Sequence, residues 1–253
     1  KTREIDRPAV QQGPKLLSAT ALATRKAGPI DLTIRRGEMV GLVGLRGAGH
    51  EEIGRALFGL EPHSGTILLD GQAPDLTSAR RAMAAGIGFV ARDRVVESVA
   101  PALSIRENAF LNPSATGRRL WSFMTAKTEA GHAQRLGAQL GLQPNDPSLA
   151  IEALSGGNQQ KVVIAKWLMT KPDVILLNDP TRGIDVGTKQ EIYRLLRELA
   201  DEGAAILFYS TDYDELIGSC DRVAIMYDGR IISELEGDDI NEKNIVSASL
   251  NIA

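Results

Sequence analysis

The residues with the clearest chemical meaning form one short stretch in the second half of the chain: Leu154, Ser155, Gly156, Gly157, Asn158 and Gln159, followed by Gln160 and Lys161. A serine and two glycines at the start of a helix place backbone N–H groups and the positive end of the helix dipole where a phosphate can bind. Taken alone, the same residues also fit an ordinary helix start capped by Ser155. The other motifs of the chain favour the phosphate site.

A glycine-rich loop follows an apolar run that reads as a buried strand. The loop consists of Gly44, Leu45, Arg46, Gly47, Ala48 and Gly49. Its spacing is that of a P-loop, in which backbone N–H groups bind nucleotide phosphates and the next two residues are Lys and Ser or Thr. A glycine-rich turn that only packs a helix on a sheet is the alternative.

The two residues after this loop depart from the P-loop pattern, because His50 and Glu51 replace the lysine and the hydroxyl residue. An imidazole is shorter than a lysine side chain and uncharged near neutral pH. A carboxylate about 4 Å from another unit negative charge is repelled by roughly 4 kcal/mol at an effective dielectric constant of about 20. Arg46 could restore some positive charge. We expect a weakened phosphate site.

Two later strands end in residues with possible catalytic roles. After the apolar run 174–177, Asn178 and Asp179 stand where a metal-binding Asp and a water-polarising Glu are expected. Asparagine brings no charge to offset Mg²⁺, and aspartate is one methylene shorter than glutamate, which disturbs the placement of an attacking water. After the run 205–209, Thr211 stands where a histidine that senses the γ-phosphate is expected. Drift at surface turns is the alternative explanation.

The order of the expected elements indicates an α/β fold, because short β-type runs alternate with segments of helical period. Asp-Gly turns within 66–72 and 224–232 are typical of hairpins and suggest an antiparallel appendage. Between about 104 and 157 the β signal fades, and 128–142 has helical spacing. This stretch therefore predicts a helical insertion.

Composition excludes several classes of function. The 253 residues are 43% hydrophobic and 24% charged, enough for one large or two small domains. The net charge of −3 gives no basic surface for nucleic acid, so no nucleic-acid partner is expected. The apolar runs are too short to span a bilayer, and no His, Cys and acidic cluster has the spacing of a metal site.

The chain's single cysteine and its first residues bear on where it works. One cysteine excludes an internal disulfide and fits a reducing compartment, and no signal-peptide pattern is present, so we expect a cytoplasmic protein. The chain begins at Lys1, and residues 1–14 are polar with two prolines, as in a linker. We therefore interpret the sequence as part of a longer protein.

Together these motifs, over residues 16–232, resemble an ATP-binding cassette. Residues 154–161 resemble its signature motif, residues 180–185 resemble its D-loop with Asp185 at the dimer interface, and residues 89–94 lie where its Q-loop runs. There Arg92, Asp93 and Arg94 are candidates for coupling nucleotide state to a transmembrane partner. The loop 44–49, the Arg-Asp-Arg segment, the Asn-Gln-Gln-Lys form of the signature and residues 180–193 more narrowly resemble the second cassette of the tandem ATPases of bacterial monosaccharide importers of the ribose, galactose and xylose type.

The resemblance implies a P-loop NTPase (RecA-like) core with an antiparallel β subdomain and a helical insertion. The expected boundaries are a linker at 1–14, the core with its β subdomain at 15–95 and 159–236, the helical subdomain at 96–158 and a tail at 237–253. It also implies ATP with Mg²⁺ as cofactors. The implied partners are an N-terminal cassette on the same chain, transmembrane permease subunits and, indirectly, a periplasmic sugar-binding protein, with the chain peripheral on the cytoplasmic face of the cell membrane.

In that family each ATP lies between the P-loop of one cassette and the signature of the other, and the second cassette's P-loop usually lacks the lysine. Here all the departures, at His50, Glu51, Asn178, Asp179 and Thr211, fall on the local site, whereas the signature matches the family. The family's second cassette tends to keep the Walker B acids, so these departures go further than usual. We therefore expect this chain to complete a partner's ATP site, and to show little or no turnover alone.

Two other functions fit parts of the pattern. A regulatory pseudo-ATPase would sense nucleotide without moving a solute. A soluble cassette ATPase acting on ribosomes or DNA is disfavoured by the acidic balance and by the absence of a basic arm.

Overall fold

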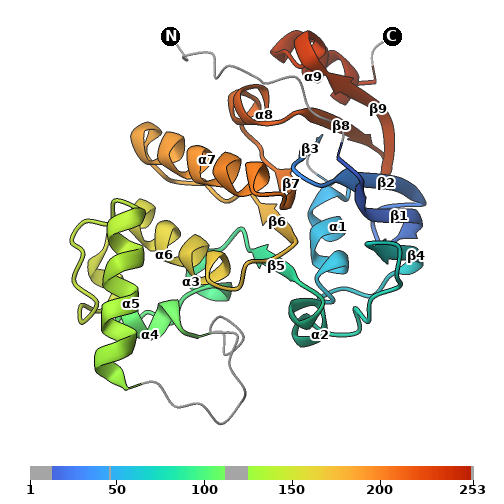
Figure 1. Ribbon diagram of the computed structural model, residues 1–253. Helices are drawn as coiled ribbons and strands as arrows, with labels where there is room; N and C mark the ends of the chain where they lie inside the picture. The colour runs from blue at the N-terminus through green and yellow to red at the C-terminus, as the bar shows by residue number, and fades with distance from the viewer. Residues whose placement is uncertain (1–12, 46, 112–124, 252–253) are drawn as a thin grey trace. The chain divides into compact units, whose positions relative to one another are not determined.

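The computed structural model describes residues 13–45, 47–111 and 125–251 (Figure 1). Most of the expected linker, and Arg46 of the glycine-rich loop, lie outside these residues. The chain divides into two compact units, one from residues 1–89, 173–179 and 196–253 and the other from residues 90–172 and 180–195.

The first unit is built on a six-stranded sheet of order β5-β6-β7-β3-β8-β9. Its central strands are short, apolar and buried, as parallel strands covered on both faces must be. Strand β7 pairs in parallel with β6 and β3, β3 pairs in parallel with β8, and β9 is antiparallel to β8. The strands are β3 (Met39–Gly44), β5 (Ile87–Val90), β6 (Val174–Asn178), β7 (Ala205–Tyr209), β8 (Arg222–Tyr227) and β9 (Arg230–Glu236).

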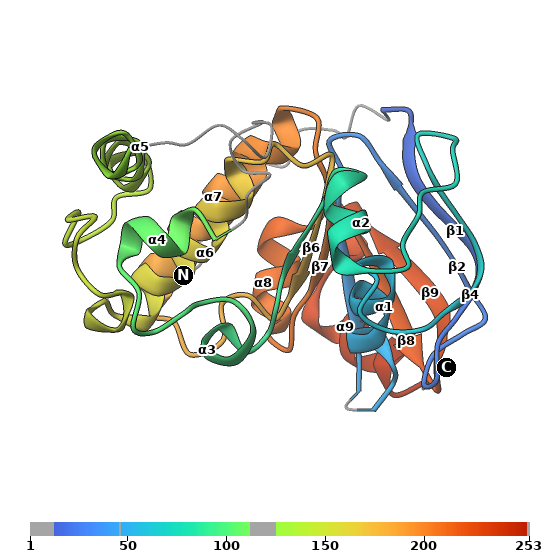
Figure 2. The same ribbon diagram turned by 90° about the horizontal axis from the view of Figure 1, so that it is seen from below.

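A separate antiparallel sheet of order β2-β1-β4 completes the strands of the first unit. It contains β1 (Lys15–Ala23), β2 (Ile30–Arg35) and β4 (Ser64–Leu69), which lie side by side in Figures 1 and 2. The two expected hairpins have different outcomes. The hairpin expected within 224–232 is formed by β8 and β9, but it belongs to the six-stranded sheet.

The hairpin expected within 66–72 was a wrong prediction. A turn at Asp70 and Gly71, both with positive φ, ends in one bridge between Leu69 and Gln72, and β4 pairs with β1 instead. Pro74 follows two residues later. Since proline has no N–H to donate, it does not extend a ladder.

Two helices of the first unit, α1 and α9, pack on the six-stranded sheet. Helix α1 packs on β3, β6 and β7, and α9 packs on β3, β8 and β9; the two lie on opposite faces in Figures 1 and 2. Helix α1 directly follows β3, so its N-terminus lies at the carboxyl end of the central strands. The elements are α1 (His50–Leu57), α2 (Ala79–Ala84), α8 (Tyr213–Ser219), η3 (Gly237–Asp239) and α9 (Glu242–Ser249).

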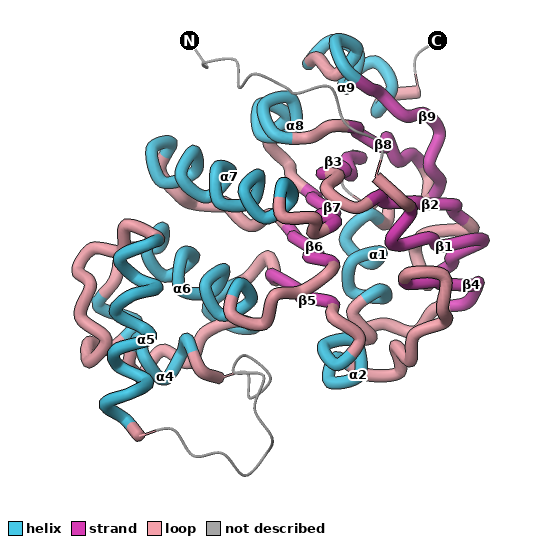
Figure 3. The backbone as a smooth tube through the Cα atoms, viewed as in Figure 1, coloured by secondary structure: helices cyan, strands magenta, loops and turns pink. Residues whose placement is uncertain are grey.

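The second unit is made of helices and loops, apart from the end of β5 (Figure 3). Helices α4, α5 and α6 pack together around a core of Ile105, Leu142, Ile151, Leu154 and Val162. The helical insertion predicted from the sequence is therefore present, and Leu154 anchors the signature-like motif in its core. The elements are α3 (Arg94–Glu97), α4 (Ile105–Ala109), α5 (Ala126–Gln139), η2 (Ile151–Ala153), α6 (Gly156–Leu168) and α7 (Val186–Asp201), which ends in the first unit.

Within residues 13–45, 47–111 and 125–251, no helix combines the length and the apolar character that crossing a bilayer requires. Over the same ranges, no group of three or more His, Cys, Asp and Glu side chains is arranged to hold a metal ion.

Candidate functional site

The first unit brings three candidate segments together at one edge of its sheet. Strand β7 lies between β3 and β6, with Tyr209 opposite both Leu42 and Asn178. The backbone N–H of Asp179 donates to the Tyr209 carbonyl oxygen at 2.8 Å. Because the carboxyl ends of parallel strands meet, the glycine-rich loop, the pair Asn178 and Asp179, and Thr211 lie at the same edge.

The glycine-rich loop makes a sharp turn from β3 into α1. Gly47 and Gly49 have φ of 92° and 87°, in the left-handed region that favours glycine. A Cβ on Gly49 would lie 2.6 Å from the Lys26 carbonyl oxygen, whereas a Cβ on Gly47 would meet nothing within 4 Å. The loop is therefore packed at its base and open at its middle, beside the N-terminal amides of α1.

His50, the first residue of α1, is turned into the protein. Its side chain is buried, with the residue only 3% exposed, and its ring stacks on Tyr209 with the centroids 4.1 Å apart and the planes at 25°. It borders a small pocket whose other walls are mainly apolar, among them Leu42, Phe89 and Leu176. The imidazole therefore fills space beneath the loop, and the half-buried Glu51 follows it on α1.

The strand-end residues form a contact of their own. The Thr211 hydroxyl donates to both carboxylate oxygens of Asp179, at 3.3 Å each. Asp179 is buried and has a positive φ of 47°. Asn178 is 7% exposed, and its Oδ1 atom is buried without a hydrogen-bond partner among the described residues. The sequence analysis predicts separate roles for these three residues, whereas in the structure Thr211 and Asp179 bind each other.

In the second unit, the signature-like residues begin the 13-residue helix α6. The Ser155 hydroxyl oxygen accepts from the backbone N–H of Asn158 at 3.4 Å and from its Nδ2 at 3.0 Å. The Gln159 Nε2 atom donates to the Leu154 carbonyl oxygen at 3.1 Å. Ser155 is exposed, Gly156 is half-buried and Gly157 is buried. The motif therefore presents a capped helix start with a solvent-accessible serine.

The D-loop candidate lies against the same helix start. Asp185 caps α7, since its carboxylate accepts from the Thr188 N–H at 3.0 Å and the Thr188 hydroxyl at 2.8 Å. These two hydrogen bonds, the backbone one first, hold the pKa of Asp185 below its usual range. A Cβ on Gly157 would lie 2.7 Å from the Thr188 Cγ2 atom, so the starts of α6 and α7 pack closely.

The three residues of the Arg-Asp-Arg segment differ in their contacts. The Asp93 carboxylate caps the short helix α3 by accepting from Val95 and Val96 N–H groups at 3.1 and 3.2 Å. The Arg94 guanidinium donates to the Gln159 Oε1 atom and to the Arg182 carbonyl oxygen, both at 3.4 Å. Arg92 is half-buried. Of the three, Arg94 is the residue that reaches both the signature-like and the D-loop-like segments.

Comparison with known proteins identifies the family. The model of the family described as ABC transporter matches residues 27–182, more than half of the chain. The chain belongs to the ABC transporter family. The ribose import ATP-binding protein RbsA 1 of Rhizobium johnstonii is 51% identical to this cassette over 228 residues, which cover 88% of this chain and 44% of that protein. The galactofuranose transporter ATP-binding protein YtfR of Escherichia coli K12 is 40% identical over 256 residues, covering 97% and 51%.

This cassette therefore spans about half the length of the curated relatives it matches. A crystal structure of a nucleotide-free ATP-binding cassette from an ABC transporter superposes with a TM-score of 0.79 at 18% identity, covering 95% of this chain and 100% of that one. A dimeric post-hydrolysis cassette bound to ADP and Pi gives 0.75 at 23% identity, covering 87% and 98%. These structures confirm the predicted P-loop NTPase fold.

One residue of the cassette that the sequence reasoning missed is Glu52. Its buried carboxylate accepts from the Lys26 backbone N–H at 3.0 Å and forms ion pairs with Arg25 and Lys26 at 3.5 and 3.6 Å. Burial acts to raise the pKa of Glu52, but a hydrogen bond from Thr24 and these partners lower it overall. Glu52 thus fixes the 24–27 segment to α1. The only feature of the sequence that could have predicted this ion pair is the presence of two adjacent cations, Arg25 and Lys26, and two adjacent carboxylates, Glu51 and Glu52.

The two phosphate-site candidates of the cassette differ in how well they fit ATP with Mg²⁺. Beneath the glycine-rich loop, His50 is stacked on Tyr209, and Glu51 holds the place of the metal-binding hydroxyl. At the start of α6, an exposed hydroxyl and the amides of the first helical turn suit an anionic phosphate. The donors at the start of α6 therefore suit a phosphate, whereas His50 and Glu51 are not the lysine and hydroxyl residue of the P-loop pattern.

Proposed function

We propose that this chain is the nucleotide-binding domain of a sugar ABC importer and the second of two cassettes on a longer chain. The relatives that match it are named for ribose import and galactofuranose transport, and it spans about half their length. Its partners are then an N-terminal cassette, transmembrane permease subunits and, indirectly, a periplasmic sugar-binding protein. The domain works at the cytoplasmic face of the cell membrane, coupling ATP binding and hydrolysis to sugar uptake.

Its own P-loop site is degenerate in this proposal, and the position of His50 is the observation that carries it. A P-loop lysine reaches the β- and γ-phosphates, whereas the His50 imidazole is buried against Tyr209. Glu51 adds negative charge where a hydroxyl would hold Mg²⁺, and Thr211 is engaged with Asp179. The glycines of the loop remain, but His50 and Glu51 hold the places of the lysine and the hydroxyl residue of the P-loop pattern.

The signature end serves ATP held by the partner cassette. ATP with Mg²⁺ in the partner's P-loop supplies the phosphoryl group and the metal. Ser155 already accepts two hydrogen bonds from Asn158, and a hydroxyl has one proton and two acceptor positions, so its proton is available to a phosphate oxygen. The amides of Gly156 and Gly157 lie ahead of the first intrahelical bond. They orient the nucleotide and stabilise negative charge on it.

The test is an ATPase assay of three samples: this chain alone, its N-terminal cassette alone, and both together. We expect background turnover from this chain alone and clear stimulation in the mixture. Ser155→Ala should lower the stimulated kcat by at least about tenfold, as loss of one preorganised donor does. Ser148→Ala, at another exposed serine of the same unit, is the control. Turnover of this chain alone well above background contradicts the proposal.

A further inference from the structure

We propose that Arg94 is a positioning residue that ties the signature motif to the D-loop within this cassette. Its guanidinium donates through Nε to Gln159 and through Nη1 to the carbonyl oxygen of Arg182. These acceptors lie 65 and 88 residues further along the chain. Gln159 in turn donates to the Leu154 carbonyl oxygen at the start of the motif. One planar, multidentate group therefore connects both loops.

The same guanidinium explains a glycine of the signature. A Cβ built on Gly156 would collide with the Nη2 atom of Arg94. The guanidinium therefore lies directly on the Gly156 backbone, at the first residue of α6. Because glycine has no side chain, it permits this approach, and a Cβ at this position would force the Arg94 guanidinium to shift.

The segment that carries Arg94 is anchored to α6 at a second point. The Lys166 Nζ atom donates to the Ser98 carbonyl oxygen at 2.9 Å, two helical turns beyond Gln159. The Ser98 N–H bonds to the Arg94 carbonyl oxygen, and the Asp93 cap fixes the start of α3. Residues 93–98 are thus held against α6 at two points. This fixes the position from which Arg94 donates to the Arg182 carbonyl oxygen.

This arrangement gives the two loops one shared geometry. The D-loop side is already joined to α6 where Thr188, which Asp185 binds, packs on Gly157. Arg94 adds a polar link on the other side of the D-loop, at Arg182. Ser155, the first amides of α6 and Asp185 are then presented to a partner as one preorganised unit. The catalytic consequence rests on the proposed function, whereas the structural link does not.

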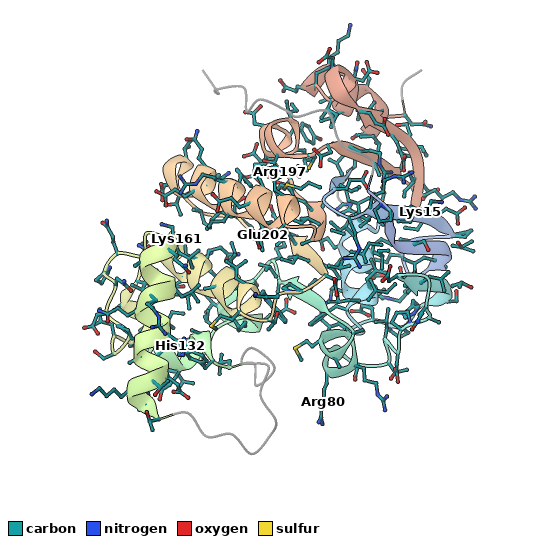
Figure 4. All side chains as sticks on the ribbon, viewed as in Figure 1. Lys15, Arg80, His132, Lys161, Arg197 and Glu202 are labelled. Atoms are coloured by element: carbon teal, nitrogen blue, oxygen red, sulfur yellow. The ribbon has the colours of Figure 1, made fainter. Side chains whose placement is uncertain are left out.

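The test is hydrogen–deuterium exchange of the intact chain, read by mass spectrometry on peptides covering 154–160 and 181–188. We expect Arg94→Ala to accelerate exchange in both peptides by at least about threefold, because amide protection follows local opening. Arg94→Lys keeps the positive charge but lacks the planar guanidinium with its several donors. It should therefore keep the wild-type exchange rate in at most one of the two peptides. Arg80→Ala, an exposed arginine of α2 labelled in Figure 4, should change neither. A wild-type rate in either peptide of Arg94→Ala overturns the inference.

Gly156→Ala provides an independent route that keeps Arg94 in the chain. The added methyl displaces the guanidinium, so exchange in 181–188 should accelerate as in Arg94→Ala. Arg94→Ala combined with Gly156→Ala should exchange no faster than Arg94→Ala alone, since both changes break the same contact. Additive effects overturn the inference.

In the mixed ATPase assay, Arg94→Ala should lower kcat and leave the KM for ATP unchanged, because the partner's P-loop holds the nucleotide. A raised KM with unchanged kcat contradicts this role. If the wild-type mixture is itself inactive, the proposed function fails, while the exchange experiment still decides the role of Arg94.

Discussion

The imidazole of His50 and the phenol ring of Tyr209 stack with their centroids 4.1 Å apart, joining the first residue of α1 to the last residue of β7. Stacked aromatic pairs contribute about 0.5–1.5 kcal/mol beyond the burial of their surface. His50 therefore stabilises the fold at a position where a P-loop lysine would serve the nucleotide. A lysine there has a flexible stem that could extend to solvent.

Close packing between α6 and α7 makes Gly157 sensitive to a single methyl group. Gly157→Ala should lower the free energy of unfolding by about 1–3 kcal/mol, the usual cost of overpacking, because its Cβ would meet the Thr188 Cγ2 atom at 2.7 Å. Adding Thr188→Ser removes that methyl, keeps the hydroxyl that binds Asp185, and should recover at least half of the loss. Urea unfolding measures both.

The control for this series is Gly131→Ala on α5, where an added Cβ meets nothing within 4 Å. It should stabilise the chain by up to about 1 kcal/mol, since alanine is the better helix former. Equal destabilisation by both alanine variants would show that the contact with Thr188 is not the cause.

Lys166 makes stability depend on pH in the alkaline range. Burial lowers its pKa from 10.5 to about 8. Between these values the unfolded chain binds more protons than the folded chain, so stability rises with pH across this window, by up to about 3 kcal/mol. Lys166→Met removes this pH dependence. The free energy of unfolding of the variant minus that of the wild type should therefore be about 2–3 kcal/mol larger at pH 7 than at pH 10.

Denaturant titrations of both proteins at pH 7, 8, 9 and 10 measure this difference. Lys127→Met, at an exposed lysine of α5, is the control and should show no such trend. A difference between Lys166→Met and wild type that stays constant from pH 7 to pH 10 contradicts the assignment.

Arg222 holds together the end of the sheet away from the glycine-rich loop. Its largely buried guanidinium bonds to Glu38 at 3.0 Å, to Glu234 at 2.8 Å and to the Thr33 carbonyl oxygen. Arg222→Met should destabilise the chain by about 3–5 kcal/mol, because it leaves the buried Glu38 carboxylate without its cation.

Adding Glu38→Gln to Arg222→Met removes the uncompensated charge and should recover part of that loss. Arg230→Met, at an exposed arginine of β9, should change stability by less than about 0.5 kcal/mol. Thermal or urea unfolding compares the variants. A double variant less stable than Arg222→Met would contradict the explanation.

Much of the fold follows from local sequence patterns. The apolar runs before Gly44, Asn178 and Ser210 are the strands β3, β6 and β7, and the serine before Gly156 caps α6. Such features are predictable because strand burial and helix capping depend on residues near each other in the chain. The hairpin expected near Asp70 failed because the partner of β4 is β1, about fifty residues earlier.

The side-chain contacts of the candidate site were not predictable in the same way. The spacing places His50 where the P-loop pattern has a lysine, but its ring stacks on Tyr209, 159 positions away in the chain. Arg94 was identified only as part of a motif, and its acceptors belong to two distant segments. The ion pair between the buried Lys161 and the exposed Glu191, which joins α6 to α7 (Lys161 is labelled in Figure 4), likewise has no local signal.

The most direct test of the central claim is calorimetric titration of this chain with ATP and Mg²⁺, repeated with His50→Lys and Glu51→Thr introduced together. We predict weak or absent binding by the unaltered chain and at least about tenfold tighter binding by the double variant, because the loop keeps its glycines and the two changes restore the lysine and the hydroxyl residue of the P-loop pattern. Tight binding by the unaltered chain would contradict the account, since the local site would then hold nucleotide despite His50 and Glu51.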